Sequence, residues 1–164
     1  MITIDNIKES LNPKYLINTG IMEEKGEKMK ITINFSKEYV LFKSDSKGLN
    51  DNDCFNPSTV VLNRKADYII FTIKNNAIHV VVVELKVSDD PREQLELTKY
   101  FADYIIDRIK YKFKCNTTQT VIRKLGIFKS KLPLSLKACT KPGKVYNNDL
   151  GFVVTQTLNL AYYL

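Results

Sequence analysis

Residues 78–87 read Ile-His-Val-Val-Val-Val-Glu-Leu-Lys-Val, an apolar and mostly β-branched run that includes two charged residues near its end. Because apolar side chains occupy both alternating sets of positions, the run predicts a central strand that is buried on both faces. A short polar turn at 74–77 separates it from further apolar residues within 60–73. A turn of this length predicts that the two strands are antiparallel neighbours.

Two charged residues in the first run, Glu84 and Lys86, require an explanation. Charged side chains are costly to bury unless they are paired or bind a metal. Residues two positions apart on a strand share a face, so these side chains should emerge side by side. Asp67, in the preceding run, can approach Glu84 across the hairpin. We therefore expect two carboxylates and one ammonium group to meet at one point.

This combination of side chains suits phosphoryl transfer. Asp67 and Glu84 offer the hard oxygen ligands that Mg²⁺ prefers, and Mg²⁺ lowers the pKa of bound water and neutralises phosphate charge. Two nearby carboxylates keep Lys86 protonated, so it is expected to act as an electrostatic stabiliser. The alternative is an ordinary Glu–Lys surface pair, since a Glu-x-Lys tripeptide often occurs by chance. The neighbouring Asp67 favours the site.

The rest of the sequence predicts a single α/β domain over residues 1–164, with a mixed central sheet flanked by helices. A helix is expected from the capping pattern at Asp90-Pro91 to about Lys112, followed by a strand within 118–128. The other expected elements are a broken helix or two short turns at 2–22, an alternating strand or hairpin through Ser36-Lys37 at 29–42, and a loop at 44–58.

The pattern of Asp67 followed by Val80–Glu84 and Lys86 resembles the PD-(D/E)xK nucleases, over about residues 60–128. The resemblance implies a restriction-endonuclease-like three-layer sandwich that cleaves DNA or, less often, RNA. It also implies Mg²⁺ as cofactor, with Mn²⁺ able to substitute, Asp67 and Glu84 as metal ligands, and Lys86 at the attacking water. Ala66 stands where the family is named for a proline, a position at which members commonly differ.

The resemblance suggests further site residues. Some branches of the family place a glutamine in the first turn of the following helix, a position that Gln94 occupies. A solvated polar residue is the alternative for Gln94. Other branches carry an acid on the first core helix that completes the metal site. Glu23, Glu24 or Glu27 could fill that role, and the sequence does not select among them.

Positive charge is concentrated at the end of the sequence. Residues 108–164 contain eleven Lys or Arg and one acid, Asp149, whereas residues 1–107 carry a small net negative charge. A basic segment beside a nuclease site predicts contacts with phosphates, although a solvated basic surface is the alternative. The residues expected to contact nucleic acid are Arg123, Lys124, Lys129 and Lys131.

Other features narrow the class of protein. No apolar run approaches the ~20 residues that cross a bilayer, and the first residues lack a secretory signal, so a cytoplasmic location without membrane contact is expected. The cysteines and His79 are too scattered for a zinc site. We expect a Mg²⁺-dependent endonuclease acting on DNA rather than RNA, in defence, mobile-element processing or repair, with a homodimer where both strands are cut. The alternatives are a non-catalytic nucleic-acid-binding module and an assembly subunit with this fold.

Overall fold

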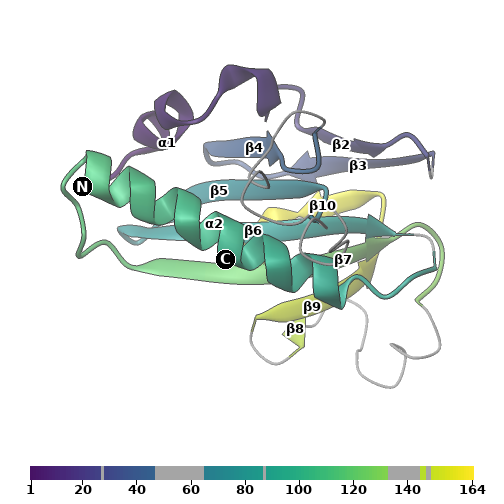
Figure 1. Cartoon of the computed structure of the whole chain (residues 1–164). Coiled ribbons are helices and arrows are strands. Elements are labelled where there is room, and N and C mark those ends of the chain that lie inside the picture. Colours follow the sequence, from purple (N-terminus) through teal and green to yellow (C-terminus); the bar gives the residue numbers. More distant parts are fainter. Residues whose placement is uncertain (27, 47–64, 87, 133–144, 147–148) are drawn as a thin grey trace, which may run out of the picture.

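The computed structural model describes residues 1–26, 28–46, 65–86, 88–132, 145–146 and 149–164. The larger sheet contains β1 (Leu16–Ile17), β4 (Tyr39–Lys43), β5 (Tyr68–Lys74), β6 (Ala77–Lys86), β7 (Thr120–Phe128), β8 (Val145–Tyr146) and β9 (Leu150–Val154). Its strand order is β1-β4-β5-β6-β7-β9-β8 (Figure 1). A smaller sheet contains β2 (Ile21–Glu24), β3 (Met29–Asn34) and β10 (Thr157–Asn159), in the order β10-β3-β2. The fold is therefore α/β with one mixed sheet and a second sheet.

The larger sheet is covered differently on its two faces. Helices α1 (Ile4–Ser10) and α2 (Arg92–Lys112) pack on one face (Figure 1). Helix α1 contacts β4 and β5, α2 contacts β6 and β7, and Val80 and Val82 of β6 belong to the core cluster on this face. The small sheet packs on the other face, against Val81 and Val83. The prediction of a strand buried on both sides is thus confirmed. The expectation of flanking helices holds for one face only, because amphipathic strands cover the other.

The central hairpin forms as predicted. Strands β5 and β6 are antiparallel, and Tyr68 pairs with Val83. Asn75 and Asn76 form the turn with positive φ angles of 51° and 61°, the conformation that a two-residue hairpin loop requires. Strand β7 then pairs parallel to β6, with Gly126 opposite Glu84. The ends of β6 and β7 therefore lie at the same edge of the sheet.

The strand predicted from residue 29 is confirmed as β3, but the hairpin through Ser36-Lys37 does not form, so that alternative was wrong. Strand β3 pairs with β2 and β10 in the small sheet, whereas β4 pairs with β1 and β5 in the large one. The burial of the two strands explains the difference. In β3 buried and exposed residues alternate, while the three central residues of β4 are all buried. The chain between them therefore passes from one sheet to the other.

Helix α2 begins at Arg92 and ends at Lys112, close to its predicted bounds. Asp90 accepts a hydrogen bond from the Arg92 N–H at the start of the helix. Its buried face includes Thr98, whose hydroxyl accepts a hydrogen bond of 2.6 Å from the Ala66 N–H. Within the described residues, no helix has both the length and the apolar character needed to cross a bilayer. Residues 60–64 and most of the expected loop at 44–58 lie outside the described residues.

Gly126 allows the beginning of α2 to approach the sheet closely. A Cβ atom at this position would lie 2.8 Å from Phe152 Cδ1 and 2.9 Å from Pro91 Cγ. Both distances are shorter than van der Waals contact, so any larger residue would displace the segment that leads from β6 into α2. Since Gly126 is paired with Glu84, this packing also supports the strand end that carries the charged residues.

We predict that Gly126→Ala destabilises the domain by about 1–3 kcal/mol, because the added methyl group overpacks a filled site. Urea unfolding should show a lower midpoint with an unchanged slope. Ser130→Ala, an exposed change just beyond β7, serves as the control and should alter stability by less than about 0.5 kcal/mol. An unchanged midpoint for Gly126→Ala would contradict this account of the packing.

Candidate functional site

Asp67 and Glu84 meet at the open end of the central hairpin. Asp67 directly precedes β5, and the pairing of Tyr68 with Val83 places it opposite Glu84. The Asp67 N–H donates to Glu84 Oε2 at 3.0 Å, and the Leu85 N–H donates to Asp67 Oδ2 at 2.7 Å. Both side chains are buried, with exposures of 7% for Asp67 and 2% for Glu84. The expected approach of these two residues is confirmed.

Lys86 lies beside Glu84 on the same strand face. Its Nζ is 2.8 Å from Glu84 Oε1. Burial acts to lower the pKa of Lys86, but the hydrogen bond to Glu84 and the charges of Glu84 and Asp67 outweigh it and raise the pKa. Lys86 is therefore a cation at neutral pH, which agrees with the sequence prediction. It can stabilise negative charge but is not available as a free base.

The electrostatics of Asp67 differ from those of an ordinary carboxyl group. Burial, together with the charge of Glu84, raises the pKa of Asp67 to about 8, against the lowering effect of the Leu85 N–H. Burial also raises the pKa of Glu84, although Lys86 opposes the change. Without a bound metal ion, Asp67 is therefore mostly protonated at neutral pH. A bound cation would favour its ionised form.

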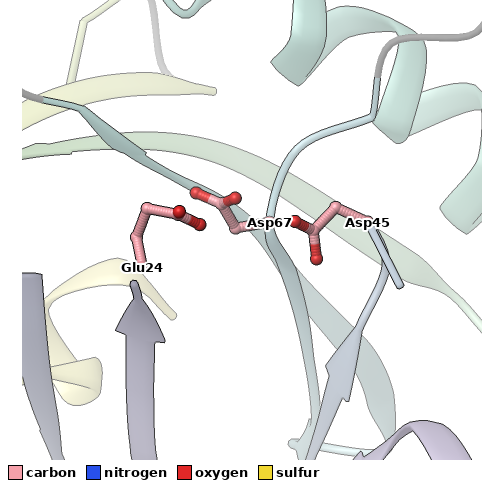
Figure 2. Close-up of side chains that lie close together, drawn as sticks. All are labelled: Glu24, Asp45 and Asp67. Carbon is pink, nitrogen blue, oxygen red and sulfur yellow. The ribbon is translucent and has the colours of Figure 1, made fainter. Parts of the chain in front are cut away.

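A second group of acids surrounds Asp67. Glu24 at the end of β2 and Asp45 just after β4 each place a carboxylate oxygen close to Asp67, and all three oxygens lie within 4.8 Å of one another. Figure 2 shows Asp67 between the other two side chains. Carboxylate oxygens at this spacing could hold a metal ion, and hard divalent cations prefer such ligands. The cluster draws on both sheets.

The structure distinguishes among the acids considered from the sequence. Glu24 belongs to the cluster, but it lies on strand β2 and not on the helix that the resemblance implied. Glu23 forms an exposed ion pair of 2.8 Å with Lys30, and Glu27 lies outside the described residues. Asp45 was not predicted. Its only signal in the sequence is its place directly after a strand, and the pairing of β4 with β5 is needed to bring it beside Asp67.

Glu84, expected as a metal ligand, has a different set of contacts. One of its oxygens contacts Lys86 and the other accepts the Asp67 N–H. Among the described residues, the acids gathered for a metal are Glu24, Asp45 and Asp67. In this arrangement Glu84 orients Lys86 and the Asp67 backbone, and its role as a metal ligand remains a prediction.

Tyr68 connects the two sheets next to the cluster. Its hydroxyl accepts a hydrogen bond from the Glu23 N–H and donates one to the Glu23 carbonyl, both at 2.8 Å. These bonds hold the end of β2, and therefore Glu24, against the large sheet. Lys43 lies over the Tyr68 ring at 4.7 Å from its centre and 3.2 Å from Asp45 Oδ1. Lys43 thereby balances part of the acidic charge.

An open cleft of about 860 Å³ lies beside the acids. Glu24 and Asp45 line it, together with Lys25, Lys43 and Tyr68. The cleft would let an extended ligand approach the carboxylates from solvent. Its lysines lie in the part of the chain whose net charge is slightly negative, so the charge pattern of the sequence did not indicate them.

The predicted helix residue Gln94 lies in the first turn of α2, and it is half-buried. The beginning of this helix packs on Gly126 through Pro91, which places Gln94 at the same edge of the sheet as Glu84. Within the described residues, no hydrogen bond joins Gln94 to Asp67 or Glu84. Its catalytic role remains a prediction.

The predicted nucleic-acid contacts divide into two groups. Lys124 is buried on the helix face, where it forms ion pairs with Glu96 and, at 3.2 Å, with Asp149, so its charge is balanced inside the domain. Arg123 is half-buried and is paired with Val81, three residues before Glu84. The contact of Arg123 and Lys124 with nucleic acid remains a prediction.

The second group follows β7. Lys129 and Lys131 are both exposed, and the Lys129 N–H donates to the Lys86 carbonyl at 3.2 Å. Lys129 is therefore adjacent to the strand end that carries the candidate site. The contact of these two lysines with phosphates remains a prediction.

Comparisons with known proteins identify no family for this chain. No family model matches the chain, and neither does any curated protein or solved structure. Function must therefore be argued from the site itself.

We predict that the metal-free domain loses stability as pH rises from about 4 to about 8. In this window the unfolded chain has released the Asp67 proton while the folded domain retains it, so folding becomes less favourable as pH rises. Asp67→Asn keeps an acceptor for the Leu85 N–H and removes this titration. Relative to wild type, it should gain on the order of 4 kcal/mol between pH 5 and pH 8.

Urea unfolding in a chelating buffer at several pH values measures this effect. Asp107→Asn, an exposed change on α2, is the matched control and should follow the wild-type pH profile. If stability changes with pH in the same way for wild type and Asp67→Asn, the pKa of Asp67 in the folded domain is not raised.

We also predict that Tyr68→Phe weakens binding of a divalent cation by about tenfold, because β2 loses the two hydrogen bonds that hold Glu24 in place. Titration calorimetry with Mn²⁺ provides the measurement. Tyr163→Phe removes a hydroxyl from another buried tyrosine in the layer of the small sheet and should leave affinity unchanged. Equal affinity of wild type and Tyr68→Phe for Mn²⁺ would contradict the positioning role of Tyr68.

Proposed function

We propose that this domain is a Mg²⁺-dependent endonuclease that hydrolyses phosphodiester bonds in DNA. The observation that carries the proposal is the convergence of Asp67, Glu84 and Lys86 at the ends of adjacent central strands. Buried carboxylates that are held together with a lysine are costly, and such arrangements concentrate at functional sites. We further propose that the mixed sheet corresponds to a restriction-endonuclease-like core.

The chemistry of the donor set fits Mg²⁺. Glu24, Asp45 and Asp67 offer only carboxylate oxygens, which suit a hard divalent cation better than a soft one. When bound there, Mg²⁺ would supply Lewis acidity toward a phosphate oxygen and lower the pKa of bound water. The raised pKa of Asp67 supports this assignment, because a bound cation would offset both the burial and the repulsion from Glu84 that keep its carboxyl group protonated.

Lys86 would act on the negative charge that develops on the scissile phosphate. It carries a positive charge at neutral pH, and its side chain retains 19% exposure although Glu84 is almost fully buried. Glu84 holds the ammonium group from the inner side, so its outer side can donate to a phosphate oxygen or orient a water molecule. A preorganised cation of this kind stabilises the transition state more than a mobile one, since it does not have to reorganise during the reaction.

The substrate would enter through the open cleft beside Glu24 and Asp45, while exposed Lys129 and Lys131 contact its backbone. DNA is proposed over RNA because the family that the sequence pattern resembles acts mostly on DNA. One site cuts one strand, so cleavage of both strands would require a homodimer or a second cut by the same molecule.

Nicking of supercoiled plasmid tests the proposal. With Mg²⁺ or Mn²⁺ we expect wild type to nick, and Asp67→Ala and Lys86→Ala to be slower by on the order of 100-fold, because each lacks a preorganised charge. A chelator should abolish nicking. Asp107→Ala and Lys8→Ala remove the same charges from exposed helix positions and should retain wild-type rates.

Two outcomes would overturn the assignment. Equal nicking by wild type, Asp67→Ala and Lys86→Ala would show that the activity comes from elsewhere. Binding of DNA without nicking by any of them would leave a non-catalytic binding module as the function.

A further inference from the structure

A second hollow, of about 240 Å³, lies on the other side of the β2–β3 hairpin from the open cleft. Three lysines line it: Lys28 in the hairpin turn, Lys30 on β3 and Lys129 after β7. No acidic side chain is among the described residues that line it, whereas the open cleft contains three acids. Among the described residues, the charged side chains that line the hollow are therefore all basic.

Backbone pairing connects the residues that line the hollow to the candidate site. The Lys129 N–H is bonded to the Lys86 carbonyl, and Met29, between the other two lysines, is paired with Glu24. The same hairpin thus presents Glu24 to the acidic cluster and Lys28 to the hollow. A ligand that occupied both places would pass directly over the ends of β2 and β6.

The exposure of these lysines lets an anion reach them. Lys28 and Lys129 are exposed, and the ion pair of Lys30 with Glu23 has 70% and 41% of its two side chains exposed. An exposed pair contributes little stability, so Lys30 can exchange Glu23 for a phosphate at small cost. The exposed Gln156 side chain adds amide donors at the rim of the hollow.

We propose that this hollow binds a backbone phosphate of the substrate strand, next to the phosphate that is cut. This inference rests on the proposed function, because it supplies the same reaction with a second point of attachment. Lysine contacts with a phosphate position the strand without reading its sequence. The site would therefore increase affinity for all DNA sequences alike and hold the strand in register over Lys86.

The test measures binding of fluorescent DNA duplexes of two unrelated sequences across a range of salt, in Ca²⁺ buffer so that no cleavage intervenes. For Lys28→Gln/Lys129→Gln we expect roughly tenfold or greater loss of affinity at low salt for both sequences. The slope of log K against log [salt] should fall by about two, one for each lost phosphate contact. In nicking assays the same variant should raise KM and leave kcat near that of wild type.

The matched control is Lys8→Gln/Lys37→Gln, which removes two exposed lysines from a separate hollow beside α1 and β4. It should keep the wild-type slope. An unchanged slope for Lys28→Gln/Lys129→Gln, an equal loss in the control variant, or no DNA binding by wild type would overturn the phosphate site. If wild type binds but does not nick, while the slope changes as expected, the phosphate site stands and the nuclease assignment fails.

Discussion

The domain depends on how two buried carboxylates are accommodated at the ends of its central strands. Asp67 and Glu84 each accept a backbone N–H from the segment that carries the other, and Glu84 also holds the Lys86 ammonium group. These contacts replace part of the hydration that burial removes. They also tie the beginning of β5 to the end of β6. The register of the hairpin and the placement of the acids are therefore set by the same bonds.

Charge in the sequence and charge at the surface are only loosely related in this domain. Lys124 belongs to the basic end of the chain, yet Glu96 and Asp149 balance it within the fold. Lys28 and Lys30 belong to the slightly acidic part, yet they line a hollow without described acidic side chains. The field that a ligand experiences thus depends on how the sheets are stacked more than on where basic residues cluster along the chain.

Local sequence was sufficient to predict the central hairpin, α2 and the approach of Asp67 to Glu84 and Lys86, because these features follow from strand alternation, turn length and helix spacing. It was not sufficient for Asp45 and Glu24. These acids reach Asp67 only because β4 pairs with β5 and because a second sheet packs beneath the first. Such contacts join segments far apart in the chain, and an exposed acid at a strand end carries no local sign of them.

The origin of the acidic cluster in two sheets has a consequence for how the domain is made. Glu24 is carried by the small sheet, whose central strand β3 is completed on its free side by β10, at residues 157–159. During translation, Glu24, Asp45 and Asp67 are synthesised well before β10. The nascent chain therefore contains all three acids while the layer that aligns them is still one strand short. Glu24 therefore gains the full support of its sheet only once β10 has been made.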